Sequence, residues 1–419
     1  MFQLTGISPL IWVLLALGLI FGILFIIFGP NRYNQLIRTI RCQAAKAPEY
    51  EAEEEEIQEE EQKQEQELEP EDSGHADVPR ISVTAFSTGR TDEVGRFLEA
   101  IAAQDYPNIE VVVVVDGSAR EASNLSETYG EAYPNVGFTF VPPEAHNLSR
   151  RKLGNTIGIK KATGDIILTT LTNIEVTSDQ WLSLMASQFG DAATEIVLGA
   201  AYMDLRPLRG PKQWYRRFDT LLTTARWMLS AIDGKPYRGD GANLAFRRET
   251  FFRNSGYGNN YFLHSGDDDI FVNQVATAAN SRFMFAPQAT VLVNWGESTR
   301  RMWINMKERY TFSARYLDNN RRVSQSLLWA DLWLYNLLLV AAGVLTGITG
   351  NLLIPIIAFV LLFAFQLMQI MLYRRLAACF RSTRLWFAVP LFYLLKPLGD
   401  ILFRLRYARN ARFNFTYRR

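Results

Sequence analysis

Three consecutive aspartates, Asp267 to Asp269, stand in the segment HSGDDDIFVNQ, directly after a glycine and before an apolar run. Adjacent carboxylates repel one another, so a chain that keeps three together needs a reason for it. One interpretation is structural: Gly266 breaks the chain, an aspartate caps a helix, and Ile270 begins its buried face. The other is chemical, because a positioned carboxylate can serve as a general base. The rest of the sequence must decide between the two.

A further carboxylate in a suggestive position is Asp116, which ends the run EVVVVVD. The run is continuously apolar, as expected for a strand covered on both faces of a sheet. In open sheets of parallel strands, ligands bind beyond the carboxyl ends of the strands. Asp116 is therefore placed for binding, although a simple turn at the end of a strand would also explain the sequence Asp-Gly-Ser.

The elements that must position these carboxylates lie between Val78 and about Pro287, where short β-rich runs alternate with amphipathic stretches. Helices are expected over residues 91–104 and 150–163. Strands are expected over Ile81–Phe86, Glu110–Asp116, Gly137–Val141, Gly164–Thr170 and Glu195–Tyr202. Strands separated by helices form βαβ units, so the predicted fold class is α/β with a mostly parallel sheet.

The composition narrows the class of protein. The chain has 419 residues, of which 48% are hydrophobic, and a net charge of +1. That is enough for one sizeable domain with additional elements. Only two cysteines occur, Cys42 and Cys379, and they lie far apart, which argues against a disulfide framework and suits a reducing compartment. The three histidines, at positions 75, 146 and 264, have no cysteine partners and do not make a zinc site.

Long apolar runs predict membrane helices. Pro9–Phe28 has no charge over a length that crosses a bilayer, and it lacks the basic start and the cleavage site of a signal peptide, the competing interpretation. Leu332–Tyr373 is also free of charge, and the interruption TGITGN divides it into two predicted helices, the first beginning near Ser326. Arginines at positions 32, 38 and 41 place the residues after the first helix in the cytoplasm.

Two segments beside these helices are strongly charged. Glu49–Asp72 is so acidic that it is predicted to be a solvated linker or a single exposed helix. The last apolar stretch carries Lys396, Pro397 and Asp400 in its middle, and charges at bilayer depth are costly. It is predicted to be an interfacial helix or hairpin, because a full span would place the basic C-terminal tail outside. A full span is the alternative.

Taken in order, these motifs resemble the membrane-anchored family 2 glycosyltransferases, which have a GT-A domain and are related to hyaluronan, chitin and cellulose synthases. The resemblance covers Ile81 to about Tyr310 and extends to the flanking membrane helices. It rests on four segments: QDYPNIEVVVVVDGS, NLSRRKLGNTIGIKKATGDIILTT, YRGDGANLAFRRETF and HSGDDDIFVNQ.

The resemblance implies roles for individual residues in donor binding and catalysis. Asp268 matches the general base that deprotonates the acceptor hydroxyl, with Asp267 beside it. Asp116 matches the residue that contacts the nucleotide. The basic residues expected near the diphosphate are Arg150, Lys152 and Arg309. A solvated helix start would equally explain the first two, and a helix on the membrane surface the third.

On the acceptor side, the resemblance points to Gly239, Asp240, Gly241 and Asn243, where glycines would let the backbone approach a sugar closely. A plain turn would explain the glycines alone. Met306 stands where the family usually has Gln in its Gln-x-x-Arg-Trp motif, which favours transfer of single units over polymer synthesis.

The sequence departs from the family at the metal site. Where the family has an Asp-x-Asp pair that holds a metal ion on the diphosphate, this chain has Leu171, Thr172 and Asn173. Asn173 and Glu175 are the remaining candidate ligands for a divalent cation, Mg or Mn. In the opening strand region, Gly89 and Arg90 replace the usual Asn-Glu.

The sequence therefore predicts an inverting glycosyltransferase that moves a sugar from a nucleotide-diphosphate donor, UDP-linked, to a glycan or lipid-linked acceptor near the membrane. The alternative is a catalytically silent GT-A-like binding or scaffold subunit of an envelope polysaccharide complex. Membrane lipids are expected partners, and nucleic acid is not. The chain is expected in the inner membrane as a multi-pass protein, with its catalytic domain in the cytoplasm.

The predicted division of the chain has five parts. They are an anchor over residues 1–30, a basic juxtamembrane segment and acidic linker over 31–77, a GT-A domain over 78–315, two membrane helices over 326–375, and an interfacial helix with a basic tail over 376–419.

Overall fold

The computed structural model describes residues 8–47, 78–145, 148–203, 210–261, 263, 265–294, 299–317, 321–348, 352–380, 382 and 385–410. The acidic stretch, the basic tail after residue 410, the tight turn at 349–351 and the three histidines lie outside these residues. The chain divides into two compact units. We call Thr39–Leu205 with Arg226–Asp318 the sheet unit, and Met1–Arg38 with Arg206–Ala225 and Asn319–Phe413 the helical unit.

The sheet unit is built on a seven-stranded sheet in the order β3-β2-β1-β4-β8-β6-β9. All its strands run parallel except β8, which is antiparallel to both neighbours. The strands are β1 (Ile81–Ser87), β2 (Ile109–Val115), β3 (Val136–Phe140), β4 (Ile166–Leu171), β6 (Ile196–Gly199), β8 (Leu244–Arg247) and β9 (Ser281–Met284). The predicted α/β class with a mostly parallel sheet is confirmed, and the first four predicted strands match β1 to β4 within two residues.

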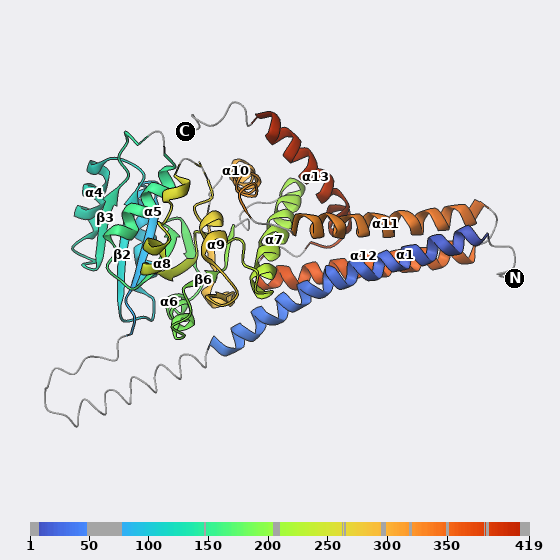
Figure 1. The fold of residues 1–419 in the computed structure, drawn as a ribbon, viewed down its shortest axis with the longest axis horizontal. Helices are drawn as coiled ribbons and strands as arrows, with labels where there is room; N and C mark the ends of the chain where they lie inside the picture. The colour runs from blue at the N-terminus through green and yellow to red at the C-terminus, as the bar shows by residue number, and fades with distance from the viewer. Residues whose placement is uncertain are drawn as a thin grey trace, which may run out of the picture. The chain divides into compact units, whose positions relative to one another are not determined.

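Helices cover this sheet, as its apolar strands require. Val111 to Val115 of β2 are all buried, because helices pack over both faces of the sheet. The two predicted helices are α3 (Thr91–Ala102) and α5 (Arg150–Lys161), and between them α4 (Ala119–Tyr129) starts at a capping box of Ser118 and Glu121. Figure 1 shows α4 and α5 beside β2 and β3. The shorter helices are α6 (Trp181–Ala186), α8 (Arg248–Arg253), α9 (Asp269–Val275) and α10 (Thr299–Ser313), with 3₁₀ turns at Ser187–Phe189, Gly258–Asn260 and Pro287–Ala289.

A second, three-stranded sheet has the order β5-β10-β7 and consists of β5 (Ile174–Val176), β10 (Val291–Val293) and β7 (Ala201–Met203). The single strand predicted over Glu195–Tyr202 is therefore wrong: it is β6 in the large sheet and β7 in the small one. The break falls at Ala200, whose carbonyl accepts a hydrogen bond of 2.9 Å from the side chain of Asn243. A buried polar contact from another segment thus divides an apolar run.

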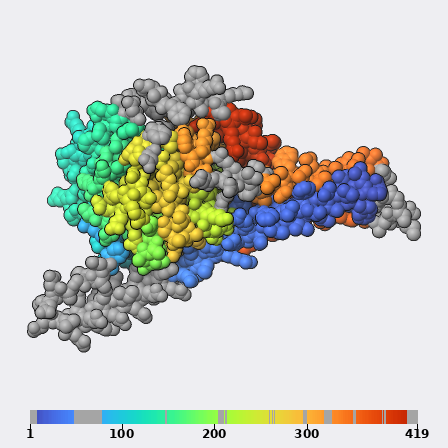
Figure 2. Space-filling view, viewed as in Figure 1, coloured from blue at the N-terminus to red at the C-terminus, as the bar shows by residue number. Residues whose placement is uncertain are grey.

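The helical unit contains α1 (Pro9–Phe28), α11 (Arg321–Ile348), α12 (Leu353–Cys379), α13 (Ala388–Asn410) and the first part of α7 (Pro211–Ile232). Three described helices are long and apolar enough to cross a membrane: Pro9–Ala47, Leu327–Ile348 and Leu353–Cys379. These are the spans expected from the sequence. α1 lies along α11, and Figures 1 and 2 show the two running side by side. A Cβ on Gly22 would lie 2.6 Å from the Tyr335 ring, so the close approach needs glycine there.

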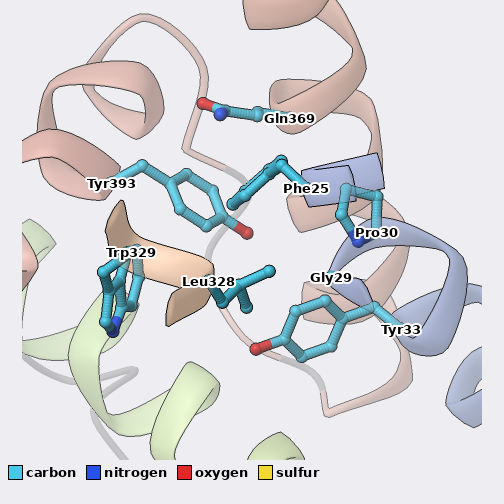
Figure 3. Close-up of a pocket in the computed structure, with 8 residues that line it drawn as sticks. All are labelled: Phe25, Gly29, Pro30, Tyr33, Leu328, Trp329, Gln369 and Tyr393. Atoms are coloured by element: carbon cyan, nitrogen blue, oxygen red, sulfur yellow. The ribbon is translucent and has the colours of Figure 1, made fainter. Parts of the chain in front are cut away.

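The helical unit is tightly packed where α1 ends. Figure 3 shows a cavity there of about 10 Å³, room for about one water molecule. Aromatic rings and one amide line it, contributed by Phe25, Tyr33, Trp329, Gln369 and Tyr393. The helices therefore leave little space between them at this point.

The last apolar stretch forms one helix, α13, and not a hairpin, and Pro397 lies inside it. It is not among the candidate spans of the described residues. The charges at its centre are paired: Lys396 forms ion pairs with Asp219 of α7 and with Asp400, the latter at 3.2 Å. Asp219 is fully buried and Lys396 nearly so, which explains how charged side chains sit within an apolar helix.

The first helix continues beyond its apolar part to Ala47, so the juxtamembrane segment is helical up to there. Within the sheet unit, the Gln43 amide donates to the carbonyl of Phe283 at 2.9 Å and accepts from the N–H of Phe285 at 2.8 Å. Gln43 thereby binds the backbone of the edge strand β9 as a neighbouring strand would.

Candidate functional site

The three adjacent aspartates point to different partners, which answers the question raised by their sequence. Asp267 forms ion pairs with two arginines: its Oδ2 lies 2.7 Å from Arg151 Nε, and its Oδ1 lies 3.2 Å from Arg309 Nη2. The carboxylate is almost fully buried. Burial opposes its ionisation, but the two guanidinium groups outweigh this and lower the pKa of Asp267. Asp267 therefore joins α5 to α10.

Asp269 has a separate cation. Its Oδ1 lies 2.8 Å from Arg238 Nε, and its Oδ2 accepts a hydrogen bond from Ser313. Arg238 also donates to Ser313 at 3.2 Å and lies over the Tyr310 ring, 3.9 Å from its centre. Burial raises the pKa of Asp269 to about 7, although Arg238 acts in the opposite direction. This pair fixes the end of α10 against the start of α9.

Asp268, the predicted base, is held mainly by backbone groups. Its Oδ2 accepts from the N–H of Gly241 at 2.9 Å, and its Oδ1 accepts from the N–H of Asp269 at 3.0 Å, where it caps α9. Arg309 is farther away, at 3.7 Å. A Cβ on Gly241 would lie 3.0 Å from Arg151 and 3.3 Å from Asp268, so glycine gives these side chains their room. Asp268 is thus the member of the triplet whose ion pair with an arginine is the longest.

Asp240 is a fourth carboxylate at this place. Its side chain is half-buried and accepts a hydrogen bond of 3.1 Å from the N–H of Ala242. Burial, and then the negative charge of Asp268, raise the pKa of Asp240 to about 6. Gly239 lies beside it and packs on Val272 and Leu198. The structure thus brings the predicted acceptor segment next to the predicted base.

Asp116 and Arg150 meet at the end of β2. Arg150 Nε donates to Asp116 Oδ1 at 2.5 Å, and its other nitrogens donate to the carbonyls of Pro142 and Val141. About a third of each side chain is exposed. The pair therefore reaches the carboxyl end of the sheet, where the sequence predicted a ligand, with Arg150 largely committed to neighbouring groups.

Two predicted site residues are placed inside the fold. Lys152 is completely buried, and its amine donates to the carbonyls of Asn260 and Leu263 at 2.8 and 3.1 Å. Burial lowers the pKa of Lys152 to about 8. Asn243 is also completely buried, donates to the carbonyls of Ala200 and Ala289, and accepts from Trp181 Nε1. The polar atoms of both side chains are thus engaged inside the fold, and the predicted roles of Lys152 at the donor and Asn243 at the acceptor stay predictions.

Asn173 and Glu175 line a cleft of about 520 Å³ together with Thr88, Arg90 and Asn294. The Asn173 amide donates to the carbonyl of Asn294 at 2.7 Å. Leu171, at the first position of the family's metal motif, is an apolar side chain that is 6% exposed. Among the described residues there is no group of three carboxylate, histidine or cysteine side chains that could hold a metal. One carboxylate and one amide are a poor donor set for Mg²⁺ or Mn²⁺, so the predicted metal site does not fit these residues.

Sequence reasoning missed the parts of the site that depend on partners distant in the chain. It did not assign Arg238, Ser313 or the pairing of Arg151 with Asp267. The one available signal was position, since Arg238 directly precedes the glycine-rich segment already singled out. Chemically, the site combines a carboxylate whose orientation is fixed by hydrogen bonds with arginines that can stabilise a negatively charged group.

The fold and this site define a sugar-nucleotide transferase domain of the GT-A class, in which a mostly parallel sheet with one reversed strand carries the site at one edge. Residues 79–321, more than half of the chain, match the family model described as glycosyltransferase like family 2. The chain belongs to this family.

Individual relatives are distant. The chain is 21% identical over 181 residues to a glucosyl-dolichyl phosphate glucuronosyltransferase of Haloferax volcanii, and the match covers 43% of this chain and 56% of the relative. Among solved structures, the mannosyltransferase PcManGT of Pyrobaculum calidifontis in complex with GDP-Man and Mn²⁺ is 18% identical, with a TM-score of 0.46, over 86% of this chain and 99% of that one. S. aureus TarS with UDP-GlcNAc is 16% identical, with a TM-score of 0.39, over 81% and 93%.

Proposed function

We propose that the chain transfers a sugar from a nucleotide-diphosphate sugar, UDP-linked, to an acceptor hydroxyl with inversion at the anomeric carbon. The observation that supports this best is the arrangement of the triplet. Asp267 and Asp269 have arginine partners, while Asp268 is held by two backbone N–H groups beside the glycine-rich segment. A carboxylate positioned by backbone N–H groups, with Arg309 farther away at 3.7 Å, is suited to accept a proton.

The reaction is a single displacement. The acceptor oxygen attacks the anomeric carbon as Asp268 removes its proton, and the bond from that carbon to the phosphate oxygen breaks. The electron pair of the broken bond moves to the diphosphate, whose negative charge Arg309 helps to offset. Arg309 suits this role, because about a third of its side chain is exposed and its guanidinium lies at Asp267 and Asp268.

The nucleotide is assigned to the end of β2. Asp116 there offers a carboxylate to the imide of a uracil or to ribose hydroxyls. Its bond to Arg150 fixes the orientation of the carboxylate while leaving part of it exposed. The acceptor is assigned to Gly239, Asp240 and Gly241, which adjoin Asp268.

The acceptor is a glycan or a lipid-linked sugar at the membrane surface. Three helices among the described residues could span a membrane, and the arginines after the first favour a sheet unit on the cytoplasmic side of an inner membrane. The Haloferax volcanii relative is, by its name, active on a dolichyl phosphate-linked sugar, which supports a lipid-linked acceptor class here.

A second candidate function is a catalytically silent subunit that binds or organises other components of an envelope polysaccharide complex. The observation that favours it is Leu171 in place of a metal-binding aspartate. The arrangement of Asp267 to Asp269 favours the enzyme, because a silent domain does not require a carboxylate held by backbone N–H groups between two carboxylates with closer arginine partners.

The test is release of the nucleoside diphosphate by full-length protein in detergent, across a panel of UDP-, GDP- and dTDP-sugars with Mg²⁺, Mn²⁺ or EDTA. Release that is lost in Asp268→Asn and kept in Asp105→Asn, a matched change on an exposed carboxylate, supports the enzyme and identifies its donor. Protein that is folded but neither binds nor turns over any of these donors contradicts the proposal and favours the silent subunit.

A further inference from the structure

Among the described residues, the end of β4 offers a poor set of ligands for a divalent ion. Leu171 is apolar and buried, and the side-chain N–H of Asn173 is bonded to the carbonyl of Asn294. Glu175 is the one carboxylate among the first residues after β4. A donor diphosphate bound beside this strand would still need positive charge to offset it, because two phosphates in a water-poor cleft repel a nucleophile and resist departure.

Positive charge lies close to this strand end. The hydroxyl of Thr170, the residue before Leu171, donates to the carbonyl of Ala242 at 2.9 Å. Ala242 follows Gly241, whose N–H donates to Asp268 and whose Cα lies against Arg151. A series of hydrogen bonds and contacts therefore connects the end of β4, where the family has its metal-binding Asp-x-Asp pair, to the arginines around the aspartate triplet.

Two of those arginines form a fixed pair. Asp267 forms an ion pair with Arg151 through one oxygen and with Arg309 through the other, so a single carboxylate joins two guanidinium groups. Each guanidinium has five N–H donors, and these ion pairs engage one nitrogen of each. The side chains of Arg151 and Arg309 are 19% and 34% exposed, whereas Asp267 is 3% exposed. The carboxylate is thus hidden behind the cations that it positions.

The neighbouring cations are less suited to a diphosphate. Lys152 is fully buried and donates to two backbone carbonyls. Arg150 donates to Asp116 and to two carbonyls.

Arg90 and Arg96, which line the cleft beside Asn173, form ion pairs with acidic residues of α3. Arg151 and Arg309 share one buried carboxylate and keep exposed N–H groups, and a guanidinium fork matches the geometry of phosphate oxygens.

We propose that Arg151 and Arg309, bridged by Asp267, take the place of a divalent ion as the counter-charge to the donor diphosphate, so that donor binding and transfer do not require a metal. This inference rests on the proposed function and deepens it. When the bond between the anomeric carbon and the phosphate oxygen breaks, the electron pair goes to the diphosphate and the two guanidinium groups offset its charge. The acceptor proton goes to Asp268.

The first experiment measures UDP binding to full-length protein in detergent by titration calorimetry, once with EDTA and once with Mn²⁺, together with the electron paramagnetic resonance signal of free Mn²⁺. We expect the same affinity for UDP in both conditions, once the binding of Mn²⁺ to free UDP is accounted for, and no loss of the free Mn²⁺ signal beyond that caused by UDP alone. Nucleoside diphosphate release from the donor is expected to continue in EDTA.

Variants then identify the counter-charge. Arg151→Gln is expected to weaken UDP binding roughly 10- to 100-fold, because a charge-assisted hydrogen bond to phosphate is lost. Binding of uridine, which has no phosphate, should change far less. Arg120→Gln, a matched change on an exposed arginine of α4, should leave the affinities for UDP and for uridine unchanged. Arg151→Lys keeps a positive charge near Asp267 and replaces the Gln variant in this test if that variant does not fold. It should lower the affinity for UDP more than the affinity for uridine.

The outcomes separate the two proposals. UDP binding or release that appears only with Mn²⁺ overturns the metal-free inference and leaves the transferase intact, as does an equal loss of UDP and uridine binding in the Arg151 variants. Absence of binding and release for UDP, GDP and dTDP donors, with and without Mn²⁺, overturns the transferase and the arginine pair together.

Discussion

Each unit has a buried cluster of oppositely charged side chains among its described residues. In the helical unit, Lys396 pairs with Asp219 and Asp400, and Asp219 is fully enclosed. In the sheet unit, four carboxylates meet three arginines, and Arg309 remains a third exposed. The first cluster brings one lysine to two carboxylates. In the second, Asp268 lies 3.7 Å from Arg309, and the side chains of Arg151 and Arg309 are partly exposed. The first arrangement neutralises buried charge, whereas the second fits the proposed base and diphosphate site.

The same type of substitution, Asp to Asn, made once in each cluster tests this difference most directly. Asp268→Asn should lower the rate of nucleoside diphosphate release about 10²- to 10⁴-fold, the usual contribution of a general base. It should also lower the melting temperature, because the amide nitrogen cannot accept from the second of the two backbone N–H groups. Asp400→Asn should leave the rate nearly unchanged, because that carboxylate touches no reacting group. Rates and melting curves of both variants check this, and equal rate losses would show that the clusters do not differ in kind.

Removing the lysine from the charged cluster of the helical unit should lower the free energy of unfolding. Lys396→Met leaves Asp219 buried without its cation, which costs about 3–5 kcal/mol of unfolding free energy. Replacing the aspartate as well, in Lys396→Met with Asp219→Leu, should recover most of the loss, since an apolar pair of similar volume avoids the buried charge. Denaturation in mixed detergent micelles, followed by circular dichroism, measures both. A double variant no more stable than the single one would refute a purely structural role.

A smaller loss is expected at Asn243, which sequence resemblance placed at the acceptor. Asn243→Ala removes the partners of Trp181 and of two backbone carbonyls, at about 1–3 kcal/mol for a buried group left unpaired. Thermal unfolding should show this destabilisation, while the UDP affinity of the folded fraction stays the same. A stable variant with altered substrate binding would return Asn243 to the site.

The smallest effect concerns pH. The folded state binds a proton at Asp240 more tightly than the unfolded chain, with the pKa raised from 3.8 to about 6. This contribution to stability is therefore present below 3.8 and is lost as the pH rises through about 6. Asp240→Asn cannot ionise, so its melting temperature should rise relative to that of the native protein over this interval. A difference that is constant with pH would contradict the raised pKa.

Much of the fold could be predicted because its signals are local. The strands Ile81–Phe86 and Glu110–Asp116 are apolar runs with helices of the correct period between them, and each was found nearly to its ends. The run from Glu195 to Tyr202 was misjudged, since nothing within it marks the break at Ala200. The cause is Asn243, more than 40 residues away, and such contacts leave no trace in periodicity.

The site was predictable to a similar degree. Asp268, Asp116 and Gly241 stand in recognisable motifs, and the structure brings Asp268 and Gly241 into contact. Lys152 and Asn243 share those motifs but point into the core, and motif membership does not reveal the direction of a side chain. Arg238 was missed because its partner, Asp269, follows only after an intervening loop and helix.

The bond between Gln43 and the backbone of β9 has a consequence for assembly. β9 is the last strand of the seven-stranded sheet, and an open edge of this kind can recruit a strand from another molecule. Gln43 occupies the carbonyl of Phe283 and the N–H of Phe285, so part of that edge is already paired. Gln43 is also synthesised some 240 residues before β9. The side chain that pairs with this edge is therefore already present when the strand is made.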